Sequence, residues 1–420
     1  MGGSEGVRGR DVPTGRGRNV PALPTPEALA LLEFARPSRA EHGFGWLDDD
    51  GNLDPSRPVF LWVTGRMTHC FALGALMGVA GCLELTRHGV AALTGGALRD
   101  AEHPGWFSAV ELDGTPVPGP KVSYDHSFVV LAASSALAAG IGEAADLLAD
   151  AFAVVEGHWW DPTFQMVTDQ ADRDFSATDP YRGANANMHM VEAFLAAAAA
   201  TGDDAWLDRA LAITTRMGAL LQEFHGRLPE HFDAQWNPLP DFNRETPADA
   251  FRPYGSTVGH WLEWSRLMLH IRAELAERGR EVPRFLDVLP PQMYRQSLAE
   301  GWAPDGHEGF VYTVDFDGTP VVRQRMHWVL TEAIGAAASL HALTGEAQYA
   351  ADIARFRDYA ARHLIERPGA WHPELGPDNT PAAGTWAGKP DIYHALQSEI
   401  VDQLPSAPPF AWALRTTHST

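Results

Sequence analysis

The sequence predicts an all-α protein in which about twelve helices pair into hairpins and close into a double-layered toroid. Five short glycine turns separate helical patterns at intervals of 47 to 77 residues, as repeated helical hairpins with variable loops would. Helices rich in glycine, alanine, histidine and tryptophan alternate with plainly amphipathic ones, which favours closed inner and outer rings over an open solenoid. The turns are Thr94-Gly-Gly, Ile141-Gly-Glu, Thr201-Gly-Asp, Arg278-Gly-Arg and Thr344-Gly-Glu.

Hydrophobic periodicity places the individual helices along the chain. One start is well marked: Pro253 and Gly255 break the chain, and Ser256 or Thr257 can cap the free N–H groups of the helix that follows. The first predicted helix begins at about Pro26, and the others cover residues 66–87, 88–98, 126–140, 143–157, 187–200, 204–222, 257–277, 282–300, 326–343, 347–365 and 390–402.

Long loops alternate with the tight turns, which puts these loops at one end of the toroid, where a site would form. They cover residues 159–187, 229–255 and 302–325, and they contain many aromatic and polar residues. Residues 309–322 alternate apolar and polar side chains around an Asp-Gly turn, which predicts a small β-hairpin at this end.

Composition limits the class of protein and its partners. A chain of 420 residues with 45% hydrophobic content can bury a large core, and its length allows one domain or two. A closed ring favours a single domain over residues 23–408. Residues 1–22 are expected to form a disordered leader and residues 409–420 a C-terminal tail. The net charge of −22 argues against a nucleic acid or an anionic membrane as partner.

The cysteines and the apolar segments indicate a cytoplasmic protein. Cys70 and Cys82 lie twelve positions apart on one predicted helix, about 18 Å at 1.5 Å per residue, too far for a disulfide. A reducing compartment is therefore expected. The sequence contains no run of 18 apolar residues, so it predicts no membrane span. The first 19 residues also lack the apolar core of a signal peptide. The sequence does not predict an oligomeric state.

Five histidines lie where a loop meets a predicted helix, beside Trp, Tyr, Asn or Arg. A histidine on its own is usually a hydrogen-bonded structural residue, but the starts of successive inner helices converge on one cavity in a closed ring. Side chains that are far apart in sequence would then become neighbours. These histidines are His69, His189, His260, His327 and His394.

His260 and Glu263 are three positions apart on a predicted helix, so the carboxylate can orient the imidazole, with Trp261 and Trp264 beside them. The other loop-to-helix boundaries carry further polar and aromatic candidates. An arginine or asparagine there can bind sugar hydroxyls, but it can equally form a buried salt bridge or cap a helix. These candidates are Trp62, Arg66, Tyr124, Asn185, Trp328, Glu332, Trp386 and Gln397.

These side chains suit a carbohydrate, and two chemistries are open. Glycoside cleavage needs a pair of carboxylates across the scissile bond, and no such pair stands out among Glu263, Glu308 and Glu332. Proton abstraction beside an open-chain aldehyde needs instead a base, a second acid or base, and donors to the enediolate oxygens. His260, His394, His189 and Arg66 fit that requirement, since an unperturbed histidine titrates near pH 6.5.

Metal catalysis is the competing mechanism. His189 and Glu192, like His260 and Glu263, place a nitrogen and an oxygen ligand on one helix face. A histidine and a glutamate three positions apart more often form a hydrogen bond that orients the imidazole. The sequence has no His-Glu-x-x-His motif or cysteine pair that would strengthen the case for a metal site. No glycine-rich phosphate loop or dinucleotide fingerprint follows a strand, so neither a metal nor a nucleotide cofactor is expected.

Taken together, these motifs resemble the N-acylglucosamine 2-epimerase superfamily, in the branch of bacterial mannose isomerases and sulfoquinovose isomerases. The resemblance covers about residues 25–404 and implies an (α/α)6 barrel. It is carried by Arg66-Met-Thr-His, Asn185-Ala-Asn-Met-His, Gly259-His-Trp-Leu-Glu-Trp, Gly306-His-Glu-Gly-Phe-Val-Tyr-Thr-Val-Asp and Lys389-Pro-Asp-Ile-Tyr-His-Ala-Leu-Gln.

The resemblance implies a metal-independent isomerase that interconverts D-mannose and D-fructose, and D-lyxose and D-xylulose, through a cis-enediolate. It makes His260 and His394 the acid/base pair, with His394 preferred as the C2/C1 base, and His189 an assisting histidine. Arg66, Tyr124, Asn185 and Trp328 would contact the sugar, and Glu263 would orient a histidine. The alternatives are a sulfoquinovose isomerase, a sugar 2-epimerase, a glycoside hydrolase on a related barrel and a non-catalytic binding protein.

Overall fold

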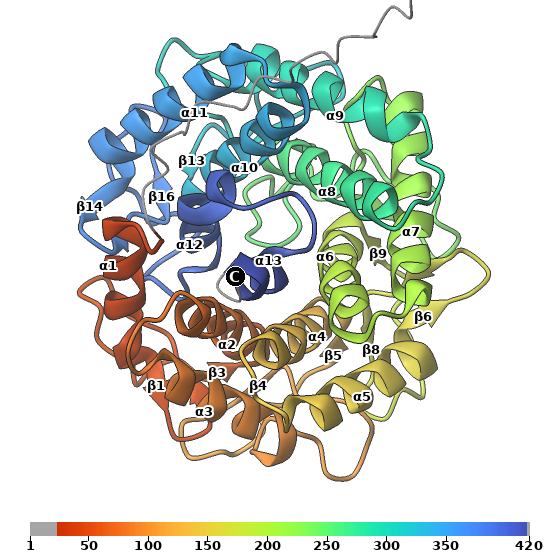
Figure 1. Ribbon diagram of the computed structural model, residues 1–420. Coiled ribbons are helices and arrows are strands. Elements are labelled where there is room, and N and C mark those ends of the chain that lie inside the picture. The colour runs from red at the N-terminus through yellow and green to blue at the C-terminus, as the bar shows by residue number, and fades with distance from the viewer. Residues whose placement is uncertain (1–22, 418–420) are drawn as a thin grey trace, which may run out of the picture.

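The computed structural model describes residues 23–417, so the predicted leader at 1–22 lies outside the described residues. The helices form two concentric rings, which confirms the predicted all-α toroid and the (α/α)6 barrel (Figure 1). The inner ring consists of α2 (Leu61–Leu76), α4 (Ser123–Ala138), α6 (Ala184–Thr201), α8 (Val258–Glu277), α10 (His327–Thr344) and α12 (Tyr393–Ile400). The outer ring consists of α1 (Pro26–Ala35), α3 (Cys82–Gly95), α5 (Ala144–Val154), α7 (Asp204–Glu223), α9 (Phe285–Gln296) and α11 (Ala347–Tyr359).

The two rings differ in how much of each helix they bury. Inner helices such as α4 and α8 are buried around nearly their whole circumference, because they have outer helices on one side and the barrel interior on the other. Outer helices bury only one face. In α7 the buried apolar residues recur three and four positions apart, at Trp206, Leu207, Ala210, Ile213, Met217 and Leu221.

Short antiparallel strand pairs fasten the N-terminal ends of the inner helices to one another. Five inner helices follow directly after a two-residue strand, and each of these strands pairs with a strand from the next segment of the chain. The pairs are β3 (Val59–Phe60) with β4 (Ala109–Val110), β5 (Lys121–Val122) with β8 (Gln170–Ala171), β9 (Arg182–Gly183) with β10 (His231–Phe232), β11 (Ser256–Thr257) with β12 (Thr313–Val314), and β13 (Arg325–Met326) with β16 (Glu374–Leu375).

The sixth junction closes the ring between the two ends of the chain. Before α12, the backbone N–H of Lys389 donates to the carbonyl oxygen of Leu47 at 2.8 Å. On the outside, α1, the first helix of the outer ring, packs against α12, the last helix of the inner ring. These two helices form the sixth pair. The barrel is therefore closed by contacts between residues more than 300 positions apart.

The predicted β-hairpin at 309–322 is present, and it is one of six similar turns. The turn after Asp315 brings Val314 opposite Pro320, and β12 also pairs with β11. Within the described residues, the same kind of bridge recurs at Leu47–Leu53, Val110–Pro116, Ala171–Thr178, Phe232–Pro238 and Leu375–Pro381. The remaining strands form local pairs: β1 (Arg39–Ala40) with β2 (Gly43–Phe44), β6 (Trp160–Asp161) with β7 (Met166–Val167), and β14 (Ile365–Arg367) with β15 (Ala370–Trp371).

One predicted helix is wrong. Residues 66–87 do not form a single helix, because Gly78 and Gly81 adopt positive φ angles of 78° and 79° that end α2 and begin α3. The predicted helix at 88–98 is the second half of α3. Cys70 and Cys82 therefore lie on different helices, and the 18 Å separation along one helix does not apply. Both are buried free thiols.

The remaining helical segments are short. Three outer helices, α5, α9 and α11, continue into single π turns at η2 (Val155–Trp159), η3 (Ser297–Gly301) and η4 (Ala360–Leu364). Two 3-10 segments, η1 (Arg36–Ser38) and η5 (Val401–Gln403), follow α1 and α12. Among the described residues, no helix has both the length and the apolar content needed to cross a membrane.

The predicted C-terminal tail is helical over most of its length. Residues 410–417 form α13 (Phe410–Thr417), which lies in the centre of the ring in Figure 1 and packs against α2, α4 and α6. Ala413 and Leu414 are fully buried, and Arg415 donates to the carbonyl of Leu137 in the last turn of α4. The helix thus covers the C-terminal end of the barrel and leaves the opposite end open to the long loops.

Replacing Gly65 with alanine is expected to lower the free energy of unfolding by about 1–3 kcal/mol, the usual cost of overpacking. An added Cβ would lie 2.6 Å from the Cβ and 2.8 Å from the carbonyl oxygen of Phe128, so α2 and α4 would have to separate. Gly95→Ala in α3 is the matched control, since nothing lies within 4 Å of its added Cβ. Denaturant unfolding measures both variants, and equal midpoints would contradict the close approach.

Candidate active site

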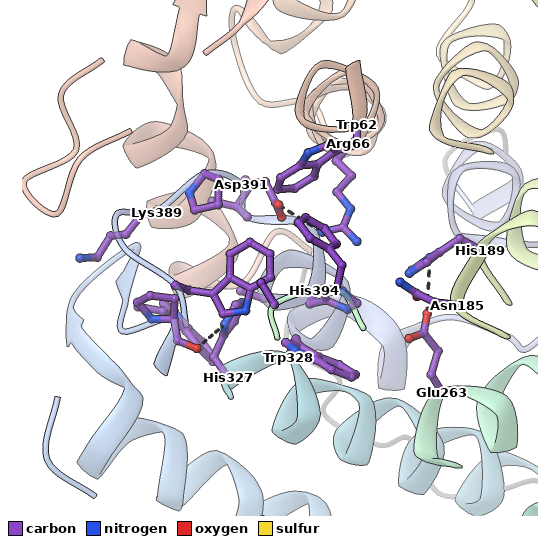
Figure 2. Close-up of a pocket in the computed structure, with 18 of the residues that line it drawn as sticks. Trp62, Arg66, Asn185, His189, Glu263, His327, Trp328, Lys389, Asp391 and His394 are labelled. Atoms are coloured by element: carbon purple, nitrogen blue, oxygen red, sulfur yellow. Dashed lines mark hydrogen bonds and ion pairs between the residues drawn. The ribbon is translucent and has the colours of Figure 1, made fainter. Parts of the chain in front are cut away.

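The N-terminal ends of the inner helices surround one cavity. Ten of the twelve site residues predicted from sequence line it, and these residues come from all six inner helices and the long loops (Figure 2). They are Trp62, Arg66, Tyr124, Asn185, His189, His260, Glu263, Trp328, Trp386 and His394. The strand pairs place these helix ends around one opening, which is why residues up to 332 positions apart meet.

Glu332 and Gln397 do not line the cavity, so their positions do not support the predicted contact with substrate. Both lie in a buried polar layer beneath it. Glu332 contacts His394 and Arg266, and the Gln397 amide donates to Glu192 at 3.3 Å. His69 belongs to the same layer, where its ring nitrogens face Ser135 and Gln397.

His260 is oriented by Glu230, and the prediction that Glu263 orients it is wrong. Glu230 Oε2 lies 2.9 Å from His260 Nδ1, and Glu230 Oε1 accepts the backbone N–H of Thr257 at 3.1 Å. An ionised carboxylate only accepts hydrogen bonds, so Nδ1 carries the proton and Nε2 keeps a free lone pair. Glu230 comes from the loop before β10, and nothing in its local sequence marks it as the partner of His260.

His394 has an equivalent arrangement with a different carboxylate. Glu332 Oε1 lies 2.9 Å from His394 Nδ1, which again leaves Nε2 unprotonated. Burial lowers the pKa of His394, and the hydrogen bond to Glu332 only partly offsets this effect. His394 is therefore a neutral imidazole at neutral pH.

Trp328 lies beside both histidines. Its ring centroid is 5.3 Å from that of His260 and 5.8 Å from that of His394, and both pairs are tilted by less than 40°. The two imidazoles therefore belong to one wall of the cavity. A molecule that packs against this indole would meet both of them.

His189 and Glu263 form a second polar group in the cavity (Figure 2). His189 Nδ1 lies 3.8 Å from Glu263 Oε1, and both this nitrogen and Glu263 Oε2 are buried without a hydrogen-bond partner. Burial lowers the pKa of His189 to about 3, so this imidazole is also neutral. Burial and the charge of Glu332 raise the pKa of Glu263 well above its usual range, so its carboxyl can donate a proton.

Arg66 presents a fixed cation to the cavity. Its Nη1 donates to Asp391 at 3.2 Å (Figure 2). Its Nη2 donates to the Tyr124 hydroxyl oxygen at 2.9 Å. The guanidinium carbon also lies 5.1 Å from the ring centroid of Trp62 and 4.6 Å from that of Tyr393. Asp391 was not predicted as a site residue, although it stands in the Lys389-Pro-Asp motif.

Two further cavity residues were given no role in the site from the sequence, although His327 was one of the five boundary histidines. His327 lies at the start of α10, with Nδ1 3.2 Å from the carbonyl oxygen of Pro373, and burial lowers its pKa to about 4. Phe251 comes from the loop at 229–255 and reaches across the opening, where its ring lies 5.3 Å from Trp386 and 6.5 Å from Trp62. A loop residue with no regular pattern around it gives no signal in the sequence.

The predicted metal-ligand spacing is realised only in part. His189, Glu192 and Glu263 each offer one donor atom, and these atoms lie within 4.8 Å of one another. Arg266 Nη1 lies 3.7 Å from Glu192, and Arg266 Nη2 lies 3.5 Å from Glu263. The buried guanidinium thus already places a positive charge beside both carboxyl groups. His260 and Glu263, the other predicted ligand pair, do not meet.

Known proteins resemble this chain over nearly its whole length. A sequence model of the N-acylglucosamine 2-epimerase (GlcNAc 2-epimerase) family matches residues 43–398. A D-mannose isomerase of Thermobifida fusca is 46% identical over 394 residues, which cover 93% of this chain and 96% of that protein. A D-mannose isomerase of Pseudomonas cannabina pv. alisalensis is 44% identical over 393 residues, which cover 92% and 94%. The crystal structure of a D-mannose isomerase aligns with a TM-score of 0.81 at 25% identity, covering 90% of this chain and 96% of that one.

The Glu230→Gln variant is expected to alter the His260 imidazole. A glutamine cannot supply the negative charge that holds the proton on Nδ1, so the ring should populate both tautomers. Glu263→Gln is the control, because its amide mimics a protonated carboxyl that does not contact His260. Histidine 15N NMR measures both variants. A tautomer change in Glu263→Gln but not in Glu230→Gln would contradict the assignment.

Proposed function

Because the chain belongs to the N-acylglucosamine 2-epimerase family, we propose that it is an aldose–ketose isomerase that interconverts D-mannose with D-fructose. D-Lyxose and D-xylulose, which lack only the terminal CH2OH of these sugars, form a second substrate pair. The protein is an isomerase that acts on a sugar. The observation that carries the finer proposal is the pair of imidazoles, each with its own carboxylate on Nδ1, beside one indole.

The proposed reaction moves one proton between adjacent carbons. One histidine, here His260, assists opening of the pyranose ring to give the free aldehyde. His394 Nε2 then takes the proton from C2, and the electron pair of that C–H bond forms the C1–C2 double bond of a cis-enediolate. His394 returns the proton to C1, while the proton of the C2 hydroxyl passes to the C1 oxygen, which carries the enediolate charge, so that C2 becomes the ketone and C1 becomes CH2OH. A lowered pKa suits His394 to this role, since the base is free at neutral pH.

Donors in the cavity would stabilise the charge on the enediolate oxygens. Arg66 is held by Asp391 and Tyr124 at the edge of the cavity, and a guanidinium in a site sheltered from water stabilises developing negative charge. The neutral carboxyl of Glu263 can donate a second hydrogen bond, and His189 and Asn185 face the same space. These residues need no proton transfer of their own to act.

The carboxylates argue against glycoside hydrolysis, which needs one carboxylic acid and one carboxylate on opposite sides of the scissile bond. Glu230 and Glu332 lie behind the two histidines, and Asp391 is paired with Arg66. Glu263 is thus left without a free carboxylate partner among the described residues that line the cavity. Proton transfer by histidine suits this arrangement better.

The charges also favour a neutral sugar over a sulfonated one. Arg66 is paired with Asp391, and Lys389 points away from the cavity toward Glu366, whose carboxylate lies 3.2 Å from Nζ (Figure 2). Among the described cavity-lining residues, neither the arginine nor the lysine lacks an acidic partner. Phe251, Trp62 and Trp386 narrow the opening with apolar rings, which suits a monosaccharide.

Incubation with D-mannose, before and after EDTA treatment, tests the proposed function. D-Fructose should form at the same rate in both samples, and His394→Asn should reduce turnover about 10²–10⁴-fold because it removes the general base. Binding of D-mannitol, an unreactive analogue, should persist in that variant. Absence of ketose from D-mannose and D-lyxose would contradict the proposal, and D-glucose as the first product would identify a 2-epimerase instead.

A further inference from the structure

A single arginine lies among three buried carboxylates beneath the cavity. Arg266 on α8 is only 2% exposed, and its guanidinium contacts Glu192 on α6, Glu263 on α8 and Glu332 on α10. The shortest of these contacts joins Arg266 Nε to Glu332 Oε2 at 2.8 Å. Three carboxylates packed this closely repel one another, so the buried cation decides which of them stay ionised.

Glu332 connects Arg266 to the proposed base. One carboxylate oxygen, Oε2, accepts from Arg266 Nε, and the other, Oε1, lies 2.9 Å from His394 Nδ1. Arg266 itself does not line the cavity, so it cannot bind the sugar directly. Any influence of Arg266 on the reaction must pass through one of its carboxylate partners.

The fold leaves a gap for this arginine. An added Cβ on Gly335 of α10 would lie 2.8 Å from Arg266 Cδ. The absence of a side chain at Gly335 therefore lets the Arg266 stem cross from α8 to α10 and reach Glu332. This packing does not depend on charge, so it helps to set the position of the Arg266 guanidinium independently of the ion pairs.

We propose that Arg266 is a positioning residue for proton transfer, which keeps Glu332 ionised and thereby holds His394 in the tautomer with the proton on Nδ1 and a free Nε2. The inference rests on the proposed function, in which His394 moves the proton. Without Arg266, Glu332 would take up a proton and could donate to His394 Nδ1. The imidazole would then carry its own proton on Nε2 and face the substrate as a donor.

The groups around Arg266 set the direction of the expected pH effect. Glu192 and Tyr393, which are hydrogen-bonded to each other, approach from α6 and α12. Glu263 and His270 are on α8 itself, Glu332 is on α10, His394 is on α12, and Phe410 of α13 lies 6.0 Å from the guanidinium. Burial raises the pKa of Glu332, but the charge of Arg266 and the hydrogen bond to His394 outweigh it and lower the pKa overall.

Loss of Arg266 leaves burial as the main influence on the Glu332 pKa, which then rises. Glu332 would be ionised only at higher pH, so the active protonation state would also be confined to higher pH. The acid limb of the profile of kcat against pH should therefore move to higher pH. Activity should be low at neutral pH and recover as the pH rises through the new Glu332 pKa.

Arg266→Met and Arg266→Lys, assayed with D-mannose between pH 5.5 and 9, test the inference. The Met variant should lose about 10²-fold or more in kcat at pH 7, with its acid limb at least one pH unit higher and KM within about threefold of the wild type. The Lys variant keeps the charge without the planar fork and should be intermediate. Arg272→Met on the same helix, which removes the outer ion pair with Asp287, should behave as the wild type.

Histidine 15N NMR gives a readout that does not depend on turnover. His394 should carry its proton on Nδ1 in the wild type and shift toward Nε2 in Arg266→Met. If the wild-type protein forms no ketose, the proposed function fails, and this measurement still decides whether Arg266 controls the His394 tautomer. A folded Arg266→Met protein with wild-type His394 signals and a wild-type pH profile would overturn the inference. A loss confined to KM would overturn it as well.

Two milder variants keep the test decisive if Arg266→Met does not fold. Gly335→Ala should displace the Arg266 guanidinium without changing any charge. Like Arg266→Met, it should lower kcat and move the acid limb of the pH profile to higher pH. Glu332→Gln should remove the carboxylate that controls the His394 tautomer. Adding Arg266→Lys to Glu332→Gln should then cause no further loss of kcat. Wild-type kcat and pH profile in both Gly335→Ala and Glu332→Gln would contradict a role for this chain of contacts.

Discussion

Backbone hydrogen bonds between two-residue strands determine where the chemistry of this protein can occur. Five inner helices each follow a strand that pairs with the next segment of the ring, so the N-terminal ends of these helices are held at one opening. The junction between Lys389 and Leu47 closes the ring and brings His394 beside residues from the first half of the chain. The opposite end is covered by α13, which leaves one open end for a substrate.

The polar groups at that end are arranged in two layers. Imidazoles, aromatic rings and the Arg66–Asp391 ion pair face the cavity, and the carboxylates that orient the two acid/base histidines lie beneath or behind. Glu230 and Glu332 each hold one histidine through Nδ1, and Arg266 compensates part of the buried negative charge. Ionised groups in such a layer are costly unless each has a partner. A neutral base at the surface of the cavity with a carboxylate behind it is well suited to take a proton and return it.

The helical architecture could be predicted because it repeats over long segments, whereas the strand pairs could not. A two-residue strand is too short to show alternation, so only the hairpin near Asp315 was visible among six similar turns. The break at Gly78 and Gly81 was missed because apolar residues continue on both sides of it. The histidines themselves were found because they recur at loop-to-helix boundaries.

Their partners were harder to predict than the histidines. Glu263 was the local candidate for His260, but three positions along a helix leave an offset of about 60° around the axis, and Glu263 reaches His189 instead. Glu230 lies 30 positions away in an irregular loop, and Glu332 lies 62 positions from His394. Contacts between neighbouring helices of the ring, or between a helix and a loop, have no fixed sequence spacing that could reveal them.

Equilibration of D-mannose and D-fructose in D2O, followed by NMR, tests the central claim most directly. A histidine that takes a proton from C2 and returns it to C1 exchanges that proton with solvent over repeated turnovers. Deuterium should therefore accumulate at C1 of fructose and at C2 of recovered mannose, with or without EDTA. Interconversion with no deuterium in either sugar would indicate direct hydride transfer between the carbons, and it would contradict proton transfer by histidine.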